Sequence, residues 1–334
     1  MSRSPQIDAV AMPPLVCPVD SQALSPAGDC VECTAGHRYP VLAGIPRMVE
    51  SLSNYADAFG QQWNKYRTTQ LDSYTGLPIT RDRMARCFGA ELWAALSGPR
   101  PLSVLEAGCG AGRFTEVLLN QPAAVVTSTD LSSAVEANQT NCPQSDRHRI
   151  IQGDILNLPF APQGFDVVMC LGVIQHTPDP EETMNRLYAQ VKPGGHLIID
   201  HYAPTLSHYT KVTAMLLRQI LIRMPPGTGL KVTPILTRIF LPGHRALRRH
   251  RWLQAVYSRV SPLLTYFQAY PQLDDQLQYE WALLDTHDHL TDYYKHLRTY
   301  AEIEAHLKSL GVEDIWVAQG GNGVEARCRR PPSG

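Results

Sequence analysis

The sequence has no long apolar run and no excess of charge of either sign. Its 334 residues contain no uninterrupted apolar stretch of the roughly 18 residues that a membrane-spanning helix needs. Residues 1–8 lack the apolar segment of a secretory signal. Lys and Arg total 30 against 31 Asp and Glu, so the net charge of −1 points to no particular partner for the whole molecule. These absences predict a cytoplasmic protein.

The eight cysteines are too few and too scattered for a disulfide framework, and only three of them are grouped. A zinc ribbon takes its four ligands from two hairpins. Position 20, where a second Cys would complete the first pair, holds an acid, so the expected ligands are Cys17, Asp20, Cys30 and Cys33, with His37 as another option for the fourth. Through its Tyr-Pro and Gly-Ile-Pro ending the segment also resembles the zinc-ribbon module that is fused to many bacterial methyltransferases or serves as an activator subunit of some tRNA methyltransferases. The alternative is a ribbon that keeps its hairpins and has lost its metal.

A glycine loop at residues 102–116 is the most informative stretch. A β-branched and Leu-rich run ends in Glu106, Gly108, Gly110 and Gly112 before helix-forming residues, which predicts a strand, a tight loop and a helix. The spacing differs from the G-x-G-x-x-G of dinucleotide sites. An acid ahead of the first glycine would repel a pyrophosphate and attract a cationic ligand.

This loop resembles motif I, E/D-x-G-x-G-x-G, of the class I methyltransferases that use S-adenosylmethionine (SAM). Further acids follow the next two expected strands. Asp130 follows 124–129, at the position where a doubly wound fold binds ribose hydroxyls. Asp154 follows 149–152, where its carboxylate can accept a hydrogen bond from an adenine amino group. The resemblance implies SAM as cofactor, with Glu106 facing its amino group. The implied cofactor-binding residues are Glu106, Gly108, Cys109, Gly110, Gly112, Asp130, Leu131, Asp154, Ile155, Leu171 and Trp63.

The alternation of strands and helices from residue 102 onward predicts an α/β fold. We expect a doubly wound, Rossmann-like, seven-stranded sheet that ends in an antiparallel hairpin formed by 312–318 and 323–329. Ahead of it, residues 55–76 resemble a segment of one bacterial methyltransferase group in which an N-terminal helix closes over SAM, and Trp63 or Tyr66 is the expected contact. One helix is expected over about 80–96.

A segment of about 90 residues separates the fifth strand from the last helix. Residues 203–273 hold ten Lys and Arg and no Asp or Glu. Since the whole chain has a net charge of −1, the charges of the remaining residues sum to −11. Residues 215–224 predict an amphipathic helix and 263–270 an aromatic surface. The segment could be a lid over an apolar or anionic substrate, a patch for an anionic membrane, a nucleic-acid groove, or an oligomer interface. Interleaved apolar residues favour the first two.

Methyl transfer from a sulfonium needs positioning and removal of a proton from the acceptor. His176, beyond the fourth strand, is the first candidate for general base; His201, Asp285 and His287 are the others. The last two lie in the polar and aromatic stretch 281–296, expected to be a His-rich loop. The spacing in that stretch matches no standard metal site.

Two motifs that the sequence lacks exclude some classes of methyl acceptor. The place of the Asn/Asp-Pro-Pro-Tyr/Phe loop of amide and base-amine methyltransferases is taken by residues 171–174, and no Pro-Cys nucleophile is present. We therefore expect O-methylation of a small or lipid-like acceptor. The alternatives are an RNA methyltransferase that holds RNA with the ribbon and the basic segment, and a non-catalytic SAM-binding scaffold. The expected parts are a ribbon (1–50), cap helices (51–100), a SAM-binding core (101–202), a helical insertion (203–295) and a C-terminal completion of the core (296–334).

Overall fold

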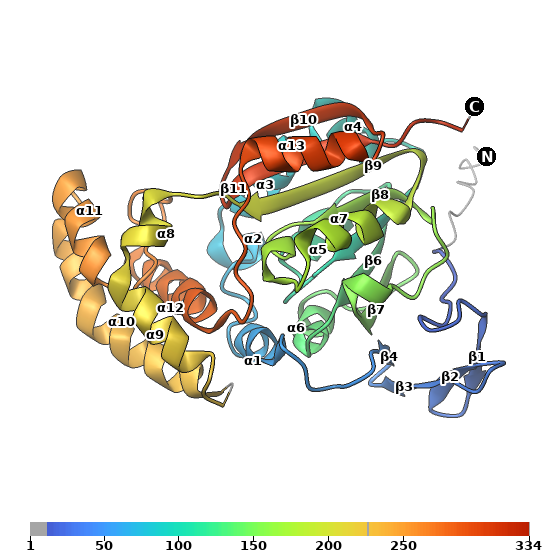
Figure 1. The fold of residues 1–334 in the computed structure, drawn as a ribbon, viewed down its shortest axis with the longest axis horizontal. Coiled ribbons are helices and arrows are strands. Elements are labelled where there is room, and N and C mark those ends of the chain that lie inside the picture. The colour runs from blue at the N-terminus through green and yellow to red at the C-terminus, as the bar shows by residue number, and fades with distance from the viewer. Residues whose placement is uncertain (1–11, 226, 334) are drawn as a thin grey trace, which may run out of the picture.

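A mostly parallel sheet forms the centre of the molecule (Figure 1). The computed structural model describes residues 12–225 and 227–333. The core strands run in the order β7-β6-β5-β8-β9-β11-β10; β5 to β9 are parallel, and β11 is antiparallel to both of its neighbours. Their bounds are β5 (Leu102–Ala107), β6 (Ala124–Asp130), β7 (His148–Gly153), β8 (Phe165–Cys170), β9 (Val191–Tyr202), β10 (Glu313–Gly320) and β11 (Gly323–Arg329). The predicted α/β class and the closing antiparallel pair are confirmed.

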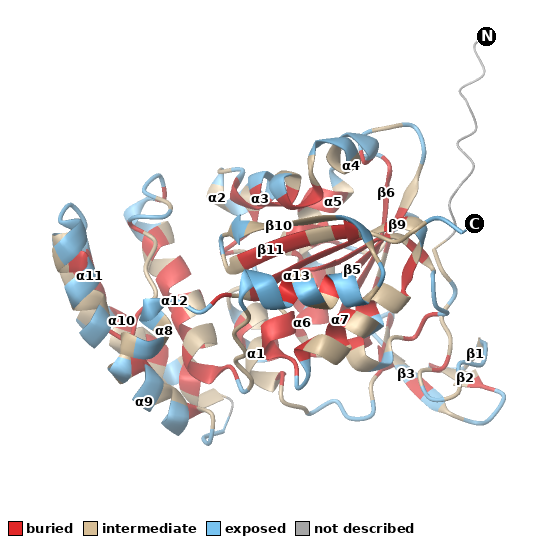
Figure 2. Cartoon of the chain, turned by 45° about the horizontal axis from the view of Figure 1, so that its top comes forward, coloured by how far each residue is buried: buried red, intermediate tan, exposed pale blue. Residues whose placement is uncertain are grey.

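Successive side chains of the central strands point to opposite faces of the sheet, and both faces are covered. Val167 packs in one cluster with Phe88, whereas its neighbour Val168 packs in another with Leu187. Figure 2 accordingly shows these strands as buried. The helices around the sheet are α3 (Ile79–Phe88), α4 (Ala90–Ala95), α5 (Arg113–Leu119), α6 (Ala134–Asn141), α7 (Pro180–Ala189) and α13 (Tyr300–Ser309).

The N-terminal ribbon is joined to this sheet. Its last strand, β4, pairs in parallel with β7 through Arg47 opposite Gln152, so the sheet has eleven strands in the described part of the chain, where the sequence predicted seven. Arg47 is 4% exposed and donates to Gln152 and Glu136, which fixes the junction. The added strand covers β7, which would otherwise be an open edge. The ribbon strands are β1 (Leu24–Ala27), β2 (Cys30–Cys33), β3 (Arg38–Leu42) and β4 (Ile45–Met48).

Short helices connect the ribbon to the sheet. They are α1 (Asp57–Lys65), α2 (Asp72–Thr75), α3 and α4. The single helix expected over 80–96 is two, because Gly89 between them has φ of +74°. A Cβ at Gly89 would stand 2.7 Å from the guanidinium carbon of Arg327, so the chain turns here where only glycine fits.

The insertion after β9 is mainly helical, as predicted, and projects from the carboxyl end of the sheet (Figure 1). Two local expectations were wrong. The stretch 281–289 belongs to a helix, and the aromatic stretch 263–270 turns inward, with Leu263 and Phe267 buried beside Ala282. The helices are α8 (Leu206–Thr210), α9 (Val212–Leu221), α10 (Gly227–Leu247), α11 (Arg251–Val260) and α12 (Asp275–Thr291). Within the described residues, no helix has the length and apolar character needed to cross a bilayer.

Candidate active site

A cavity of about 400 Å³ lies between the carboxyl ends of the strands and the helical insertion. Open α/β sheets bind ligands at this edge, where the strand order reverses, here around β5. Loops that follow four strands contribute to its wall: 108–111 after β5, 130–131 after β6, 154–155 after β7 and 171–173 after β8. Its volume is within the range of about 300–1,000 Å³ typical of small-molecule sites.

The backbone of the glycine loop packs closely against the side chains of neighbouring segments. Gly108, Gly110 and Gly112 have φ of +80°, +50° and +91°, a region that other residues rarely adopt. A Cβ at Gly108 would lie 2.2 Å from Val173 Cγ2, and one at Gly110 would lie 3.3 Å from the Trp63 ring. Two of these glycines and Cys109 line the cavity, whereas Gly112 caps α5 and does not.

Asp130 stands where the sequence places a ribose-binding carboxylate. Its Oδ2 accepts from the backbone N–H of Gly110 at 2.9 Å, and its Oδ1 accepts from the N–H and hydroxyl of Ser132. These bonds aim the carboxyl group and tie β6 to the glycine loop. Both Asp130 and Leu131 line the cavity.

Asp154 and Ile155 form the next part of the wall. Asp154 caps a short 3-10 turn by accepting from Leu156 N–H at 2.9 Å. Burial raises the pKa of its carboxyl. Ile155 is 6% exposed and presents an apolar side chain beside that carboxyl, a pairing suited to a flat polar-edged ring. Leu171, the last of the predicted cofactor residues, also lines the cavity.

Glu106, by contrast, does not line the cavity. It is 1% exposed, and its Oε2 accepts from the hydroxyls of Thr115 at 2.5 Å and Ser128 at 2.9 Å. Burial raises the pKa of Glu106 to about 7. Oε2 therefore joins α5 to β6 behind the glycine loop, whereas Oε1 is buried without a hydrogen-bond partner among the described residues.

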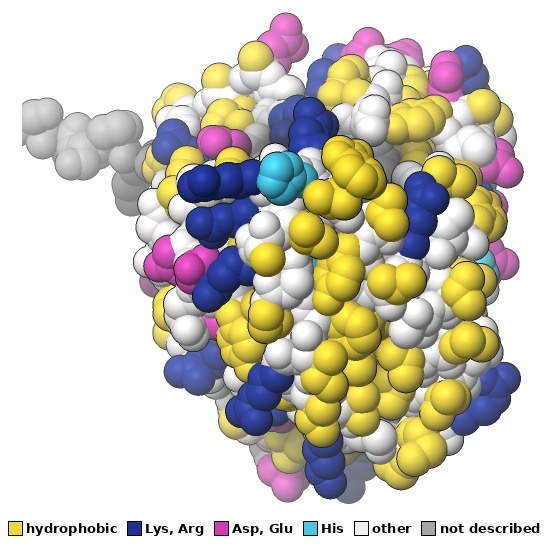
Figure 3. All heavy atoms as spheres, turned by 90° about the vertical axis from the view of Figure 1, so that its left-hand side faces the viewer, with side chains coloured by type: hydrophobic (Ala, Val, Ile, Leu, Met, Phe, Trp, Pro, Cys, Tyr) yellow, Lys and Arg dark blue, Asp and Glu magenta, His cyan; other side chains and the backbone are white. Residues whose placement is uncertain are grey.

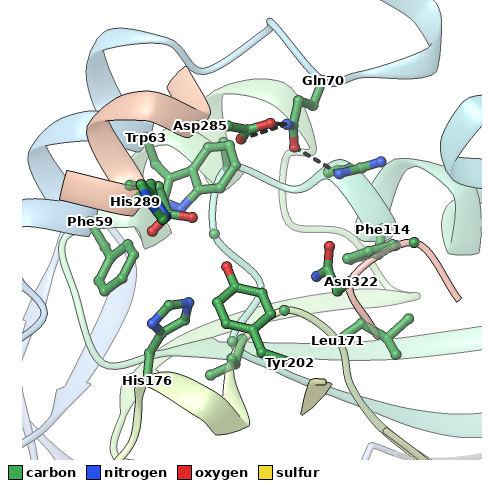
Figure 4. A pocket seen from close by; sticks show the side chains of 18 of the residues that line it. Phe59, Trp63, Gln70, Phe114, Leu171, His176, Tyr202, Asp285, His289 and Asn322 are labelled. Atoms are coloured by element: carbon green, nitrogen blue, oxygen red, sulfur yellow. Dashed lines mark hydrogen bonds between the residues drawn. The ribbon is translucent and has the colours of Figure 1, made fainter. Parts of the chain in front are cut away.

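Helix α1 covers the cofactor end of the cavity, with Phe59 and Trp63 facing inward (Figure 4). The Trp63 ring lies against Gly110, so α1 packs directly on the glycine loop. Tyr66, the other aromatic proposed for this role, ends α1 as its C-cap and is not among the lining residues.

His176 lies at the floor of the cavity beside Tyr202 (Figure 4). Its Nδ1 lies 3.1 Å from the carbonyl oxygen of Tyr294, to which it can only donate, so its Nε2 carries the free lone pair. Burial lowers the pKa of His176 to about 3. The imidazole is thus neutral at physiological pH, and its free nitrogen accepts a second proton only weakly.

The other predicted bases divide into one that faces the cavity and two that do not. Asp285 faces it, but its carboxylate accepts from Tyr266 and from Gln70, whose own Oε1 accepts from Arg113 (Figure 4). Burial raises the pKa of Asp285 to about 6. His287 donates from Nδ1 to Gln62 at 2.6 Å and holds α12 against α1; neither it nor His201, buried on β9, lines the cavity.

Sequence reasoning missed Asp288. It lines the cavity one turn along α12 from Asp285, and its carboxyl has no hydrogen-bond partner among the described residues. Burial, together with the charges of Asp292 and Asp285, raises its pKa well above the ordinary value. Asp292 is different, because Arg218 and Lys295 pair with it at 2.6 and 2.8 Å. The sequence does show an acid three residues after Asp285. Assigning that acid to the cavity wall required knowing that the stretch is helical.

Aromatic side chains form a further part of the cavity wall, which we call the acceptor side. Tyr266, Tyr270 and Trp281 contact one another with ring centroids 5.1–5.7 Å apart. The guanidinium of Arg113 lies 5.7 Å from the Trp281 ring. This end suits a flat, partly apolar ligand.

In the ribbon, four side chains converge. Cys17, Asp20, Cys33 and His37 place one ligand atom each within 4.8 Å of one another. The predicted ligand Cys30 lies outside this group, where Arg38 donates to its sulfur at 3.2 Å. Cys30 and Cys33 are three residues apart on strand β2, so their side chains point to opposite faces, and His37 takes the fourth position.

Comparisons with known proteins match the segment of the chain that contains the glycine loop and the strands that follow it. A family described as "Methyltransferase domain" matches residues 105–199. The ubiquinone biosynthesis O-methyltransferase of Pseudomonas entomophila is 35% identical over 98 residues, covering 28% of this chain and 41% of that protein. Its counterpart in Coxiella burnetii (strain RSA 493) is 34% identical over 96 residues, covering 28% and 41%. The chain thus spans less than half the length of these relatives.

Among solved structures, human N-acetylserotonin methyltransferase in complex with SAM matches 82% of this chain and 57% of its own, with a TM-score of 0.44 and 15% identity. Magnesium protoporphyrin IX methyltransferase from Synechocystis PCC 6803 with bound SAH matches 84% and 97%, with a TM-score of 0.43 and 14% identity. The matched family segment spans β5 to β9 and carries the three predicted strand-end acids. Residues 105–199 thus match a methyltransferase domain, and this segment contains the loops that the sequence assigns to SAM.

Proposed function

We propose that the protein transfers a methyl group from SAM to an oxygen of a small, flat and partly apolar acceptor. One observation carries the proposal: a single cavity joins the loops typical of a SAM site to the aromatic acceptor side. The matched relatives are named O-methyltransferases of ubiquinone biosynthesis, which supports an oxygen atom as the acceptor.

We assign the cofactor end to SAM because its polar groups fit that molecule. The carboxyl of Asp130 would accept from ribose hydroxyls, Asp154 and Ile155 would hold the adenine, and the loop at Gly108 and Gly110 would lie along the methionine part. SAM, when bound, supplies an electrophilic methyl on a sulfonium. Trp63 over the glycine loop excludes water from this end of the cavity.

We assign removal of the acceptor proton to Asp288. In the transfer, the acceptor oxygen forms a bond to the methyl carbon as the carbon–sulfur bond breaks, and the oxygen loses its proton. A carboxylate with a raised pKa takes a proton more readily than an imidazole whose pKa is about 3. His176 is then a positioning residue, which packs against Tyr202 and forms part of the cavity wall beside the acceptor. Asp285, already bonded to Tyr266 and Gln70, orients the aromatic wall.

We further propose that each part of the chain predicted from the sequence has its own role. The core (101–202, completed by 296–334) binds SAM, the cap (51–100) closes over it, the insertion (203–295) holds the acceptor, and the ribbon (1–50) binds zinc. The cluster in the ribbon fits zinc, because bonds of about 2.0–2.3 Å at tetrahedral angles set ligand atoms about 3.3–3.8 Å apart. The observed separations that involve His37 Nδ1 are 3.5, 3.3 and 3.1 Å, to Cys17, Cys33 and Asp20.

The proposal is tested by measuring methyl transfer from labelled SAM to matched acceptors. The panel contains hydroxylated aromatic rings with and without an isoprenoid tail, the corresponding aromatic amines, and transfer RNA. We expect label on the ring hydroxyls, with amines and RNA unlabelled. Transfer to RNA alone would replace the proposal with the RNA alternative. SAM binding without transfer to any acceptor would favour a scaffold.

A further inference from the structure

The insertion exposes apolar side chains at one-turn intervals on three neighbouring helices. On α11, Trp252, Val256 and Val260 are 70%, 60% and 58% exposed. On α10, Ile235 and Ile239 are 57% and 62% exposed. Residues four apart lie on one side of a helix, so each set forms a stripe that no part of the described chain covers.

Helix α9 adds a third stripe, formed by Val212, Leu216 and Ile220, which are 57%, 62% and 59% exposed. The three helices lie together, since α11 packs on both α9 and α10. Figure 3 views this side of the molecule and shows apolar side chains gathered over it, with Lys and Arg between and around them. We call these eight residues on α9, α10 and α11 the apolar face.

The segment that carries the apolar face has charged side chains of one sign only. Eight of the ten cations of residues 203–273 are exposed, and the segment has no acid. Arg245 and Arg248 pair with Asp275 of α12. The others have no ion-pair partner within the described residues, and they are Arg223, Lys231, Arg238, Arg249, Arg251 and Arg259.

This combination selects among possible occupants. A second copy meeting the same face would place unpaired cations against cations, because a two-fold interface is self-complementary. A nucleic acid would pair with the cations but leave the apolar stripes in contact with phosphates and water. An anionic bilayer satisfies both features: apolar side chains enter the boundary of headgroups and acyl chains, and cations meet anionic headgroups.

A second cavity lies beside α11 and adjoins the active-site cavity. It has a volume of about 450 Å³ and is lined partly by Arg251 and Ala255 of α11. Four residues, Ser207, Lys211, Leu264 and Tyr266, line both it and the active-site cavity. The second cavity therefore lies between α11, which carries one stripe of the apolar face, and the acceptor side.

We propose that α9, α10 and α11 dock the enzyme on an anionic lipid surface and that the second cavity admits a lipid-like acceptor from that surface. The docking stands on the exposed helices alone; the admission of an acceptor rests on the proposed methyl transfer. The acceptor class becomes an aromatic hydroxyl compound with a hydrophobic tail that resides in the bilayer.

Flotation of the full chain with phosphatidylcholine vesicles, with and without phosphatidylglycerol, tests the docking. We expect binding only to the anionic vesicles and loss of binding as salt is raised. Ile239→Asp should weaken the partition coefficient at least about tenfold, since it removes apolar contact and adds a repelled charge. Arg249→Gln should weaken it about fivefold. Leu52→Asp and Arg81→Gln are matched controls, exposed but outside the insertion, and should bind as the parent does.

The outcomes separate docking from catalysis. Ile239→Asp should keep the parent rate on a soluble, tail-free acceptor and lose rate only on the tailed acceptor presented in vesicles. Equal binding of parent and Ile239→Asp to anionic vesicles would overturn the proposal, as would a dimer in sedimentation velocity that this substitution dissociates. Vesicle binding without any methyl transfer would leave the docking standing and remove the proposed function.

Discussion

Replacement of Gly108 by alanine should damage the cofactor end of the site in a way that can be divided into two causes. The residue has φ of +80°, where an L side chain costs about 1–2 kcal/mol. The new Cβ would also stand 2.2, 2.9 and 3.0 Å from three side-chain atoms of Val173. No rotation about one bond moves all three away, so overpacking adds about 1–3 kcal/mol. We expect Gly108→Ala to lower the free energy of unfolding by about 2–5 kcal/mol.

The two causes separate in a double-mutant cycle with Val173→Ala. Removing both methyl groups of Val173 relieves the two shortest contacts and leaves the backbone cost, so the double variant should recover up to about 1–3 kcal/mol relative to additivity. Urea unfolding measures the stabilities, and calorimetric titration with SAM measures affinity, which should follow the same order. Unchanged stability and SAM affinity in Gly108→Ala would refute the reasoning, and strict additivity would refute the role given to Val173.

Three further results are expected. Asp130→Ala should weaken SAM binding about 10-fold to 100-fold in calorimetry, because it removes a charged acceptor and frees the Gly110 N–H; an unchanged affinity would contradict its role. Asp288→Asn should lower the single-turnover rate about 10²-fold to 10⁴-fold with SAM affinity retained. Because burial raises the pKa of Asp288, the parent rate should fall as pH drops through a value above the usual carboxyl range, and the variant should lose that limb. His37→Asn should remove bound zinc and lower the melting temperature, whereas Cys30→Ser should retain the metal; the reverse pattern in metal analysis would restore the Cys30 ligand set.

The cofactor end of the site was predictable because its residues are encoded locally. Each of the acids Asp130 and Asp154 follows its own strand, and parallel strands bring their carboxyl ends to one edge of the sheet. The glycine loop has the same local character, since its backbone angles depend on residue type more than on distant contacts. Glu106 is the exception, because the direction of a side chain at a strand end depends on what lies behind the loop, here Thr115 and Ser128.

The acceptor side was not predictable in the same way. Helix α12 has buried residues around much of its circumference, including Trp281, Leu284 and His287, so it lacks the apolar stripe by which a surface helix is found in a sequence. Asp285 and Asp288 of this helix face a cavity whose other walls are formed by residues about 100 and about 200 positions earlier in the chain. The hydrogen bond between Gln70 and Asp285 is one such long-range contact. Contacts of this separation leave no periodic signal.

The ribbon shows how a motif can predict a kind of site and still mislead about its members. Two cysteines with two residues between them chelate one ion when the backbone between them turns. Here residues 30–33 form an extended strand paired with β1 and β3, and an extended backbone sends Cys30 and Cys33 to opposite faces. The turn that follows brings His37 back beside Cys33, with Nδ1 and Sγ 3.3 Å apart. The cysteine spacing therefore predicted a cluster in this segment, but the exclusion of Cys30 and the inclusion of both Asp20 and His37 required the conformation of the chain between the ligands.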